Sequence, residues 1–191
     1  VYSDVPRRKL EMDVVEDQRT ATEVVDAALS LFDEGALPTP FFLWVHLFDP
    51  HRPLSAPEPF TRRALVGAST QTPYAELERR MYHAEVAYAD AELGRLLDGI
   101  AQRRPGEEVL FACVSDHGEG FGEHKESSHG LQVFDTTMRV PMLLQHPRLP
   151  AGTVIEAPVS TADLAPTLLA LLGVEAAETS GRNLSRLIDD P

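Results

Sequence analysis

The sequence predicts an α/β fold in which helices flank a mostly parallel β-sheet. Short, continuous apolar runs occupy residues 40–48, 107–115 and 140–146. Strands that are buried on both faces of a parallel sheet have this unbroken apolar pattern. Segments with apolar residues at helical spacing alternate with these runs, and that alternation is typical of a sheet covered by helices.

The first predicted helix spans residues 18–34, where apolar residues recur every three or four positions. Gly35 is a suitable end for this helix. The preceding residues 1–17 are polar and irregular, so we expect no regular element there. The aromatic-rich run 40–48 follows the helix and leads into a proline-rich stretch, which predicts a loop.

A long helix is predicted from about Pro73 to about Arg103, because proline suits the first turn of a helix. The second and third strands follow it and are separated by a loop rich in glycine and serine. The last predicted helix is strongly apolar. Ser160 and Thr161 are candidate N-caps for it, and Gly173 is a candidate for the residue just after its C-terminus.

Composition excludes several classes of protein. The 191 residues include 17 basic and 30 acidic side chains, a formal net charge of −13. This charge argues against a nucleic-acid-binding surface and against a polybasic membrane contact. Cys113 is the only cysteine, which rules out an intrachain disulfide and a thiolate zinc site.

The sequence shows neither a signal peptide nor an apolar stretch of the about 18 residues that a membrane span needs. We therefore expect no membrane segment in this chain. The chain begins with valine rather than methionine, which predicts either processing or a piece of a longer protein.

Ligand-type side chains follow the predicted strand 107–115. Functional residues gather beyond the carboxyl ends of strands in open parallel sheets. Asp116 and His117 lie at that place, and together they offer oxygen and nitrogen ligands to one divalent cation. Gly118 then lets the backbone turn tightly. In the alternative interpretation, Asp116 caps a following helix and His117 is merely exposed.

The stretch HLFDPH offers a second group of polar residues, at the end of the run 40–48. His51 follows a proline that fixes the local backbone, and it is a candidate donor to an anionic group. His46 still lies inside the apolar run, so we expect it to be buried. His129 in ESSHG is a candidate acid or anion-binding donor. The other polar side chains of this loop, Glu119, Glu123 and His124, could be ligands, although loop carboxylates are usually solvated.

Taken together, these segments resemble the sulfatase family within the alkaline phosphatase superfamily. The resemblance runs from about Gln18 to about Leu184, and its most specific part is SDHGEGFGEH…HG…RVP with FDPH upstream. It implies an alkaline-phosphatase-like sulfatase fold, of which residues 18–191 form the C-terminal part of the catalytic domain. It also implies a metal-dependent sulfuric ester hydrolase.

The resemblance assigns roles position by position. Asp116 and His117 match the later pair of metal ligands in the family. His51 matches the histidine that contacts the sulfate group. His129 matches the position that holds Lys, Arg or His against the bridging oxygen of the ester. His51 and His129 are therefore the expected catalytic and substrate-binding residues. Ca²⁺ is the expected metal, with Mn²⁺, Mg²⁺ or Zn²⁺ as alternatives.

Two features of the family are absent from the sequence. The family nucleophile is a Cys or Ser in C/S-x-P-x-R that is converted to formylglycine, and no such motif occurs here. The early Asp pair that supplies the other metal ligands is absent too. We therefore expect the nucleophile and its formylglycine outside this chain, and we expect the chain alone to bind metal weakly and to be inactive.

Two other functions stay open at this point. One is a phosphoesterase, a phosphonate hydrolase or a phospho-group transferase of the same superfamily, which the Asp–His pair allows. The other is a non-catalytic, sulfatase-like binding module. The expected partner is a sulfate ester, whose alcohol the sequence does not identify. The resemblance implies a periplasmic or extracellular location, and nothing in the sequence fixes the oligomeric state.

Overall fold

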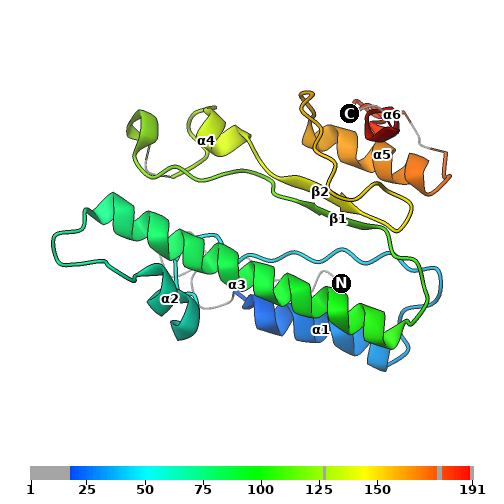
Figure 1. Ribbon diagram of the computed structural model, residues 1–191, viewed down its shortest axis with the longest axis horizontal. Helices are drawn as coiled ribbons and strands as arrows, with labels where there is room; N and C mark the ends of the chain where they lie inside the picture. The colour runs from blue at the N-terminus through cyan, green and yellow to red at the C-terminus, as the bar shows by residue number, and fades with distance from the viewer. Residues whose placement is uncertain (1–17, 127, 176–177, 190–191) are drawn as a thin grey trace, which may run out of the picture. The chain divides into compact units, whose positions relative to one another are not determined.

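The computed structural model describes residues 18–126, 128–175 and 178–189 (Figure 1). The predicted irregular segment 1–17 lies outside the described residues. The chain divides into two compact units, one ending at Gly106 and the other beginning at Glu107.

The first unit contains three helices, α1 (Ala21–Asp33), α2 (Glu58–Ala64) and α3 (Tyr74–Arg103). Thr20 begins α1 with a capping box, because its side chain accepts a hydrogen bond from the Glu23 backbone while the Glu23 carboxylate accepts one from the Thr20 backbone. The two long helices predicted from apolar spacing are thus confirmed.

Helices α1 and α2 both pack along α3, as Figure 1 shows. The Tyr88 hydroxyl on α3 accepts a hydrogen bond from the backbone N–H of Thr22 at 3.0 Å and lies 2.7 Å from the Thr22 hydroxyl. Arg103 forms an ion pair with Asp33 at the other end of α1. One cluster in the core of this unit consists of Ala21, Ala56, Ala84 and Tyr88, with Leu47, Phe60 and Ala64 packed against them.

The run 40–48 is extended, but it belongs to no β-ladder among the described residues. Exposure alternates along it, and Phe42 and Trp44 are 86% and 66% exposed. The prediction of a strand buried on both faces is therefore wrong for this run. A strand needs neighbouring strands to pair its backbone and cover its faces, and the described regular elements of the first unit are all helices.

The second unit contains a two-stranded sheet, β1 (Phe111–Val114) and β2 (Met142–Gln145). The strands are antiparallel, with Phe111 opposite Gln145 and Val114 opposite Met142. The expected parallel arrangement is not observed for this pair. Parallel neighbours need a long crossover, usually a helix. Only the 3₁₀ turn η2 (Glu123–Lys125) and the short α4 (Asp135–Met138) lie between these two strands in the described part of the chain.

The rest of the second unit consists of η3 (Thr161–Asp163), α5 (Leu164–Leu171) and α6 (Ser185–Asp189). As predicted, Ser160 caps the start of this helical segment, and Gly173 follows its end with a φ of +70°. No helix in the described ranges is long and apolar enough to cross a membrane.

Candidate active site

Strand β1 leads directly into the predicted metal ligands. The backbone N–H of His117 donates to Oδ1 of Asp116 at 2.9 Å, and the Ser115 hydroxyl donates to the carbonyl oxygen of His117 at 2.6 Å. These bonds fix the turn that follows the strand. The structure thus agrees with the sequence in placing the Asp–His pair at the end of β1.

Gly118 is required at this turn because another part of the chain comes too close for a side chain. Its backbone N–H donates to the carbonyl oxygen of Thr137 at 2.8 Å. A Cβ atom at position 118 would lie 2.2 Å from the carbonyl oxygen of Thr136. The glycine therefore allows the segment at α4 to pack against the turn that holds His117.

The hydrogen bonds of His117 fix which of its nitrogens can bind a metal. Nδ1 lies 2.8 Å from the carbonyl oxygen of Gly118. A carbonyl oxygen only accepts, so Nδ1 carries the proton and Nε2 carries the lone pair. Histidines that bind metals commonly donate their other ring N–H in this way.

Asp116 presents the second ligand beside that lone pair. Its Oδ2 atom lies 3.8 Å from Nε2 of His117, and its side chain is 78% exposed. The two atoms fit two neighbouring ligand positions of one divalent cation. They do not complete a site, since Ca²⁺ takes about 6–8 ligands. No group of three or more His, Cys, Asp or Glu side chains in the described part of the chain could hold a metal ion.

His129 lies against His117. The two rings stack with centroids 3.9 Å apart and an angle of 26° between their planes. Nδ1 of His129 lies 3.3 and 3.4 Å from the two carboxylate oxygens of Glu119, which accept a hydrogen bond from its N–H group. The structure therefore brings the predicted acid His129 next to the predicted ligand His117.

Glu119 belongs to the candidate site through its contact with His129. Its side chain is only 5% exposed, whereas a solvated loop carboxylate was expected. One of its oxygens also accepts from the backbone N–H of Gly120 at 3.0 Å. Its burial depends on a contact with a residue ten positions later, which no local pattern predicts.

Glu126 holds the loop that carries His129. Its Oε1 atom accepts from the backbone N–H groups of Leu131 and Gln132, both at 3.2 Å. The residue is 7% exposed, and its Oε2 atom is buried without a hydrogen-bond partner among the described residues. No sequence pattern distinguished this carboxylate from the other acidic residues of the loop.

Glu123 and His124 make local contacts. A Glu123 carboxylate oxygen accepts from the backbone N–H of Phe121 at 2.6 Å. The His124 ring stacks on Phe134 with centroids 4.0 Å apart. Both contacts shape the loop between β1 and α4.

His51 lies in the first unit and is half-buried. Its Nδ1 atom lies 2.7 Å from the carbonyl oxygen of Arg52, so Nδ1 carries a proton. The His51 ring packs on the Phe48 ring, with the two ring centroids 4.6 Å apart. Nε2 donates to an anion only when both ring nitrogens are protonated. His46, by contrast, is exposed and stacks on Trp44 at 6.1 Å, so the expectation that it is buried is wrong.

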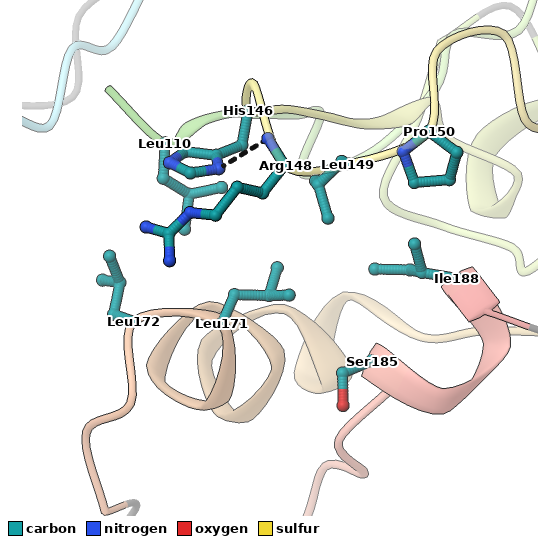
Figure 2. Close-up of a pocket in the computed structure, with 9 residues that line it drawn as sticks. All are labelled: Leu110, His146, Arg148, Leu149, Pro150, Leu171, Leu172, Ser185 and Ile188. Atoms are coloured by element: carbon teal, nitrogen blue, oxygen red, sulfur yellow. Dashed lines mark hydrogen bonds between the residues drawn. The ribbon is translucent and has the colours of Figure 1, made fainter. Parts of the chain in front are cut away.

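A separate cavity of about 180 Å³ in the second unit contains none of the predicted site residues (Figure 2). Leu171 and Leu172 form one side of it, at the end of α5. At its other side His146 and Arg148 both approach the carboxylate of Glu108, at 3.7 and 3.3 Å. Because an acidic side chain already pairs with both basic ones, this cavity is no evident anion site.

Comparisons with known proteins agree with the resemblance. The sulfatase family model matches residues 2–174. An ulvan-active sulfatase from Formosa agariphila is 30% identical over 181 residues, which is 88% of this chain and 35% of that protein. The chain thus spans about a third of the length of this relative.

Solved structures show the same fold. A putative sulfatase from Bacteroides fragilis has a TM-score of 0.70 at 23% identity, covering 88% of this chain and 40% of that one. The phosphonate monoester hydrolase of Agrobacterium radiobacter has a TM-score of 0.72 at 22% identity, covering 90% and 43%. The fold is therefore part of the alkaline-phosphatase-like α/β fold, and the chain belongs to the sulfatase family.

Proposed function

We propose that this chain forms the C-terminal part of the catalytic domain of a metal-dependent sulfuric ester hydrolase. The observation that supports it most is the stack of His117 and His129 directly after β1, with Nε2 of His117 beside a carboxylate oxygen of Asp116. Sulfatases generally use a divalent metal and a formylglycine nucleophile, and in this proposal the nucleophile lies outside the present chain.

In the proposed site, Oδ2 of Asp116 and Nε2 of His117 hold the metal, together with ligands from outside this chain. Ca²⁺ is the ion that the family resemblance implies, and Asp116 would supply one of the oxygen ligands that Ca²⁺ takes. When bound, a divalent ion stabilises the negative charge that develops on the sulfuryl oxygens. The backbone contacts of Gly118 keep the two ligands in place.

The two histidines act on the ester itself. His51 has a proton on both ring nitrogens, and its Nε2–H group donates a hydrogen bond to a sulfuryl oxygen. His129 gives the proton on its Nε2 to the bridging oxygen while the bond between sulfur and that oxygen breaks, so the alcohol leaves neutral. Glu119 keeps the Nδ1 proton of His129 in place, which leaves Nε2 to transfer the proton.

The test is substitution of both histidines in the full-length protein. We expect His51→Ala and His129→Ala each to lower the turnover of an aryl sulfate by about 10²–10⁴-fold, the range for a lost acid or charge-stabilising donor. His124→Ala is the matched control, because its ring only stacks on Phe134. Near-normal turnover in both variants, with the fold intact by circular dichroism, would contradict the assignment.

A second candidate function is hydrolysis of phosphonate or phosphate esters. The observation that favours it is the similar fold of the phosphonate monoester hydrolase from Agrobacterium radiobacter. A non-catalytic binding module is the third candidate. It predicts that the full-length protein turns over neither type of ester. Export to the periplasm or the extracellular space stays a prediction, which fractionation of the source cells would test.

A further inference from the structure

The loop 49–56, which carries His51, is attached to helix α3 by a buried carboxylate. Glu85 lies on α3 and is 2% exposed. One of its oxygens accepts a hydrogen bond from the backbone N–H of Ser55, and the backbone of Ala56 also donates to this carboxylate. Two successive backbone groups just after His51 are therefore bound to one side chain.

A second carboxylate on the same face of α3 binds the loop 49–56 at a residue that precedes Ser55 and Ala56. Glu78 forms an ion pair with Arg52, the residue next to His51. Glu78 and Glu85 are seven residues apart, which is about two helical turns, so both side chains lie on one face of α3. The helix thus contacts the loop at Arg52 and again at Ser55.

Packing completes the attachment. Ala56 is 8% exposed and belongs to the core that Ala84 and Tyr88 of α3 form. The loop therefore cannot shift at its far end without breaking the core of the first unit. The backbone N–H of His51 in addition donates to the carbonyl oxygen of Phe48 at 2.9 Å, which closes a tight turn around the histidine.

The buried position of Glu85 is costly for the protein. Burial raises the pKa of the Glu85 carboxyl, and the nearby charge of Asp49 raises it further. Asp49 lies in the same loop, and its Oδ2 atom is buried without a hydrogen-bond partner in the described ranges. An apolar side chain at position 85 would avoid the cost of burying this carboxylate, but it could not accept the hydrogen bonds of the loop.

We propose that Glu85 is a positioning residue for His51, holding the loop 49–56 on α3 so that the imidazole keeps its place beside the sulfate group. This inference rests on the proposed function, because it assumes that His51 contacts the substrate. Glu85 itself touches no substrate in this account. It acts through the backbone of Ser55 and Ala56.

The test is a double-mutant cycle in the full-length protein, with kcat/KM for an aryl sulfate as the measurement. Glu85→Met keeps the volume of the side chain and removes the acceptor, and we expect a loss of about 10²-fold, the effect of a small misplacement of a catalytic group. Glu85→Gln keeps an acceptor oxygen and should retain most of the activity. The double variant Glu85→Met, His51→Ala should be no slower than His51→Ala alone.

Tyr88→Phe is the matched control, since it removes the hydrogen bonds between the Tyr88 hydroxyl and Thr22 and keeps the ring in the core cluster that includes Ala56. A wild-type value of kcat/KM in Glu85→Met would overturn the inference. So would a double variant in which the fold-losses of the two single variants multiply, because independent effects on the activation free energy are additive. Unchanged turnover in His51→Ala would instead overturn the proposed role of His51 and this inference with it. If Glu85→Met fails to fold, the inference is tested by hydrogen exchange of the Ser55 amide in the wild-type protein. Rapid exchange would exclude the hydrogen bond between this amide and Glu85.

Discussion

At the scale of single residues, three histidines share one arrangement. In each of them, Nδ1 lies within hydrogen-bond distance of an oxygen that can only accept a hydrogen bond. This oxygen is the backbone carbonyl of Arg52 for His51, the backbone carbonyl of Gly118 for His117, and a carboxylate oxygen of Glu119 for His129. Nδ1 of each ring is engaged in this hydrogen bond, so Nε2 is the atom that can bind a metal or act on a substrate. In the proposed site that atom is a metal ligand in His117, a hydrogen-bond donor to the sulfuryl oxygen in His51, and the donor of the transferred proton in His129.

A prediction at this scale concerns Gly118. A Cβ atom there would meet the carbonyl oxygen of Thr136 at 2.2 Å, so Gly118→Ala must push the backbone apart. We expect a loss of about 1–3 kcal/mol in the free energy of unfolding, typical of overpacking. We also expect a weaker metal affinity, since the turn that holds Asp116 and His117 would move. Urea denaturation and a calcium titration of the full-length protein measure the two effects.

Gly94→Ala is the control for that substitution. Gly94 lies inside α3 with no atom within 4 Å of the position that a Cβ would take. Alanine in a helix interior is favoured over glycine by about 0.5–1 kcal/mol, so this variant should be slightly more stable. Equal stability of the two variants would show that the close approach at Gly118 is not as described.

At the scale of elements, one carboxylate joins the start of the last helical segment to a later part of the chain. Asp163, at the end of η3, is 2% exposed. It accepts from the backbone N–H of Arg182 at 2.7 Å and from that of Ser160 at 2.9 Å. These hydrogen bonds, from Arg182 first and then Ser160, lower the pKa of Asp163.

This arrangement predicts a dependence of stability on pH. Because the folded protein lowers the pKa of Asp163, the carboxylate stabilises the fold above its unfolded pKa of about 3.9. That stabilisation is lost as the pH falls through the lower pKa of the folded state. Asp163→Asn should lower the Tm by several degrees at pH 7 and should weaken the fall in Tm between pH 5 and 3.

Thermal scans of the full-length protein across this pH range measure the effect. The control is Asp98→Asn, because Asp98 is exposed on α3. If Asp163→Asn and Asp98→Asn had the same pH dependence as the wild type, Asp163 would not join these elements.

Apolar spacing predicted α1, α3 and the apolar helix that ends before Gly173, but not the pairing of the strands. The short helices α2, α4 and α6 were not predicted, because elements this short show no apolar period. Pro73 marked the start of α3, whereas the capping box that Thr20 forms at the start of α1 was not predicted. The direction of β2 relative to β1 depends on how the chain between them folds back, which no local pattern contains. The run 40–48 was misjudged for the same reason, since its burial depends on distant neighbours.

The candidate site shows the same division. The positions of Asp116 and His117 after a strand could be predicted, because strand ends are visible in the sequence. The roles of Glu85, Glu119 and Glu126 could not. Each is an acidic residue whose burial arises from packing with a segment that is not adjacent in the sequence, and acidic residues are usually exposed.

At the scale of the whole molecule, the chain spans 35% of the length of the ulvan-active relative. The proposed metal has two ligand atoms here, on Asp116 and His117. We therefore predict that removing the metal from the full-length protein with a chelator abolishes turnover of a sulfate ester. Adding Ca²⁺ back should restore it, as measured by the release of the alcohol.

Asp116→Ala provides the internal comparison for the metal prediction. This variant should already be almost inactive, and the chelator should change its rate little. Full activity of the wild type in excess chelator, with no metal detected by mass spectrometry, would exclude the proposed role of Asp116 and His117.

The proposed function is that the full-length protein hydrolyses sulfate esters. The most direct measurement is kcat/KM of the purified full-length protein for the sulfate ester and the phosphonate monoester of one aryl alcohol. We predict that the sulfate ester is the faster substrate and that His129→Ala removes this activity. Faster hydrolysis of the phosphonate monoester, or no hydrolysis of either ester, would contradict the account.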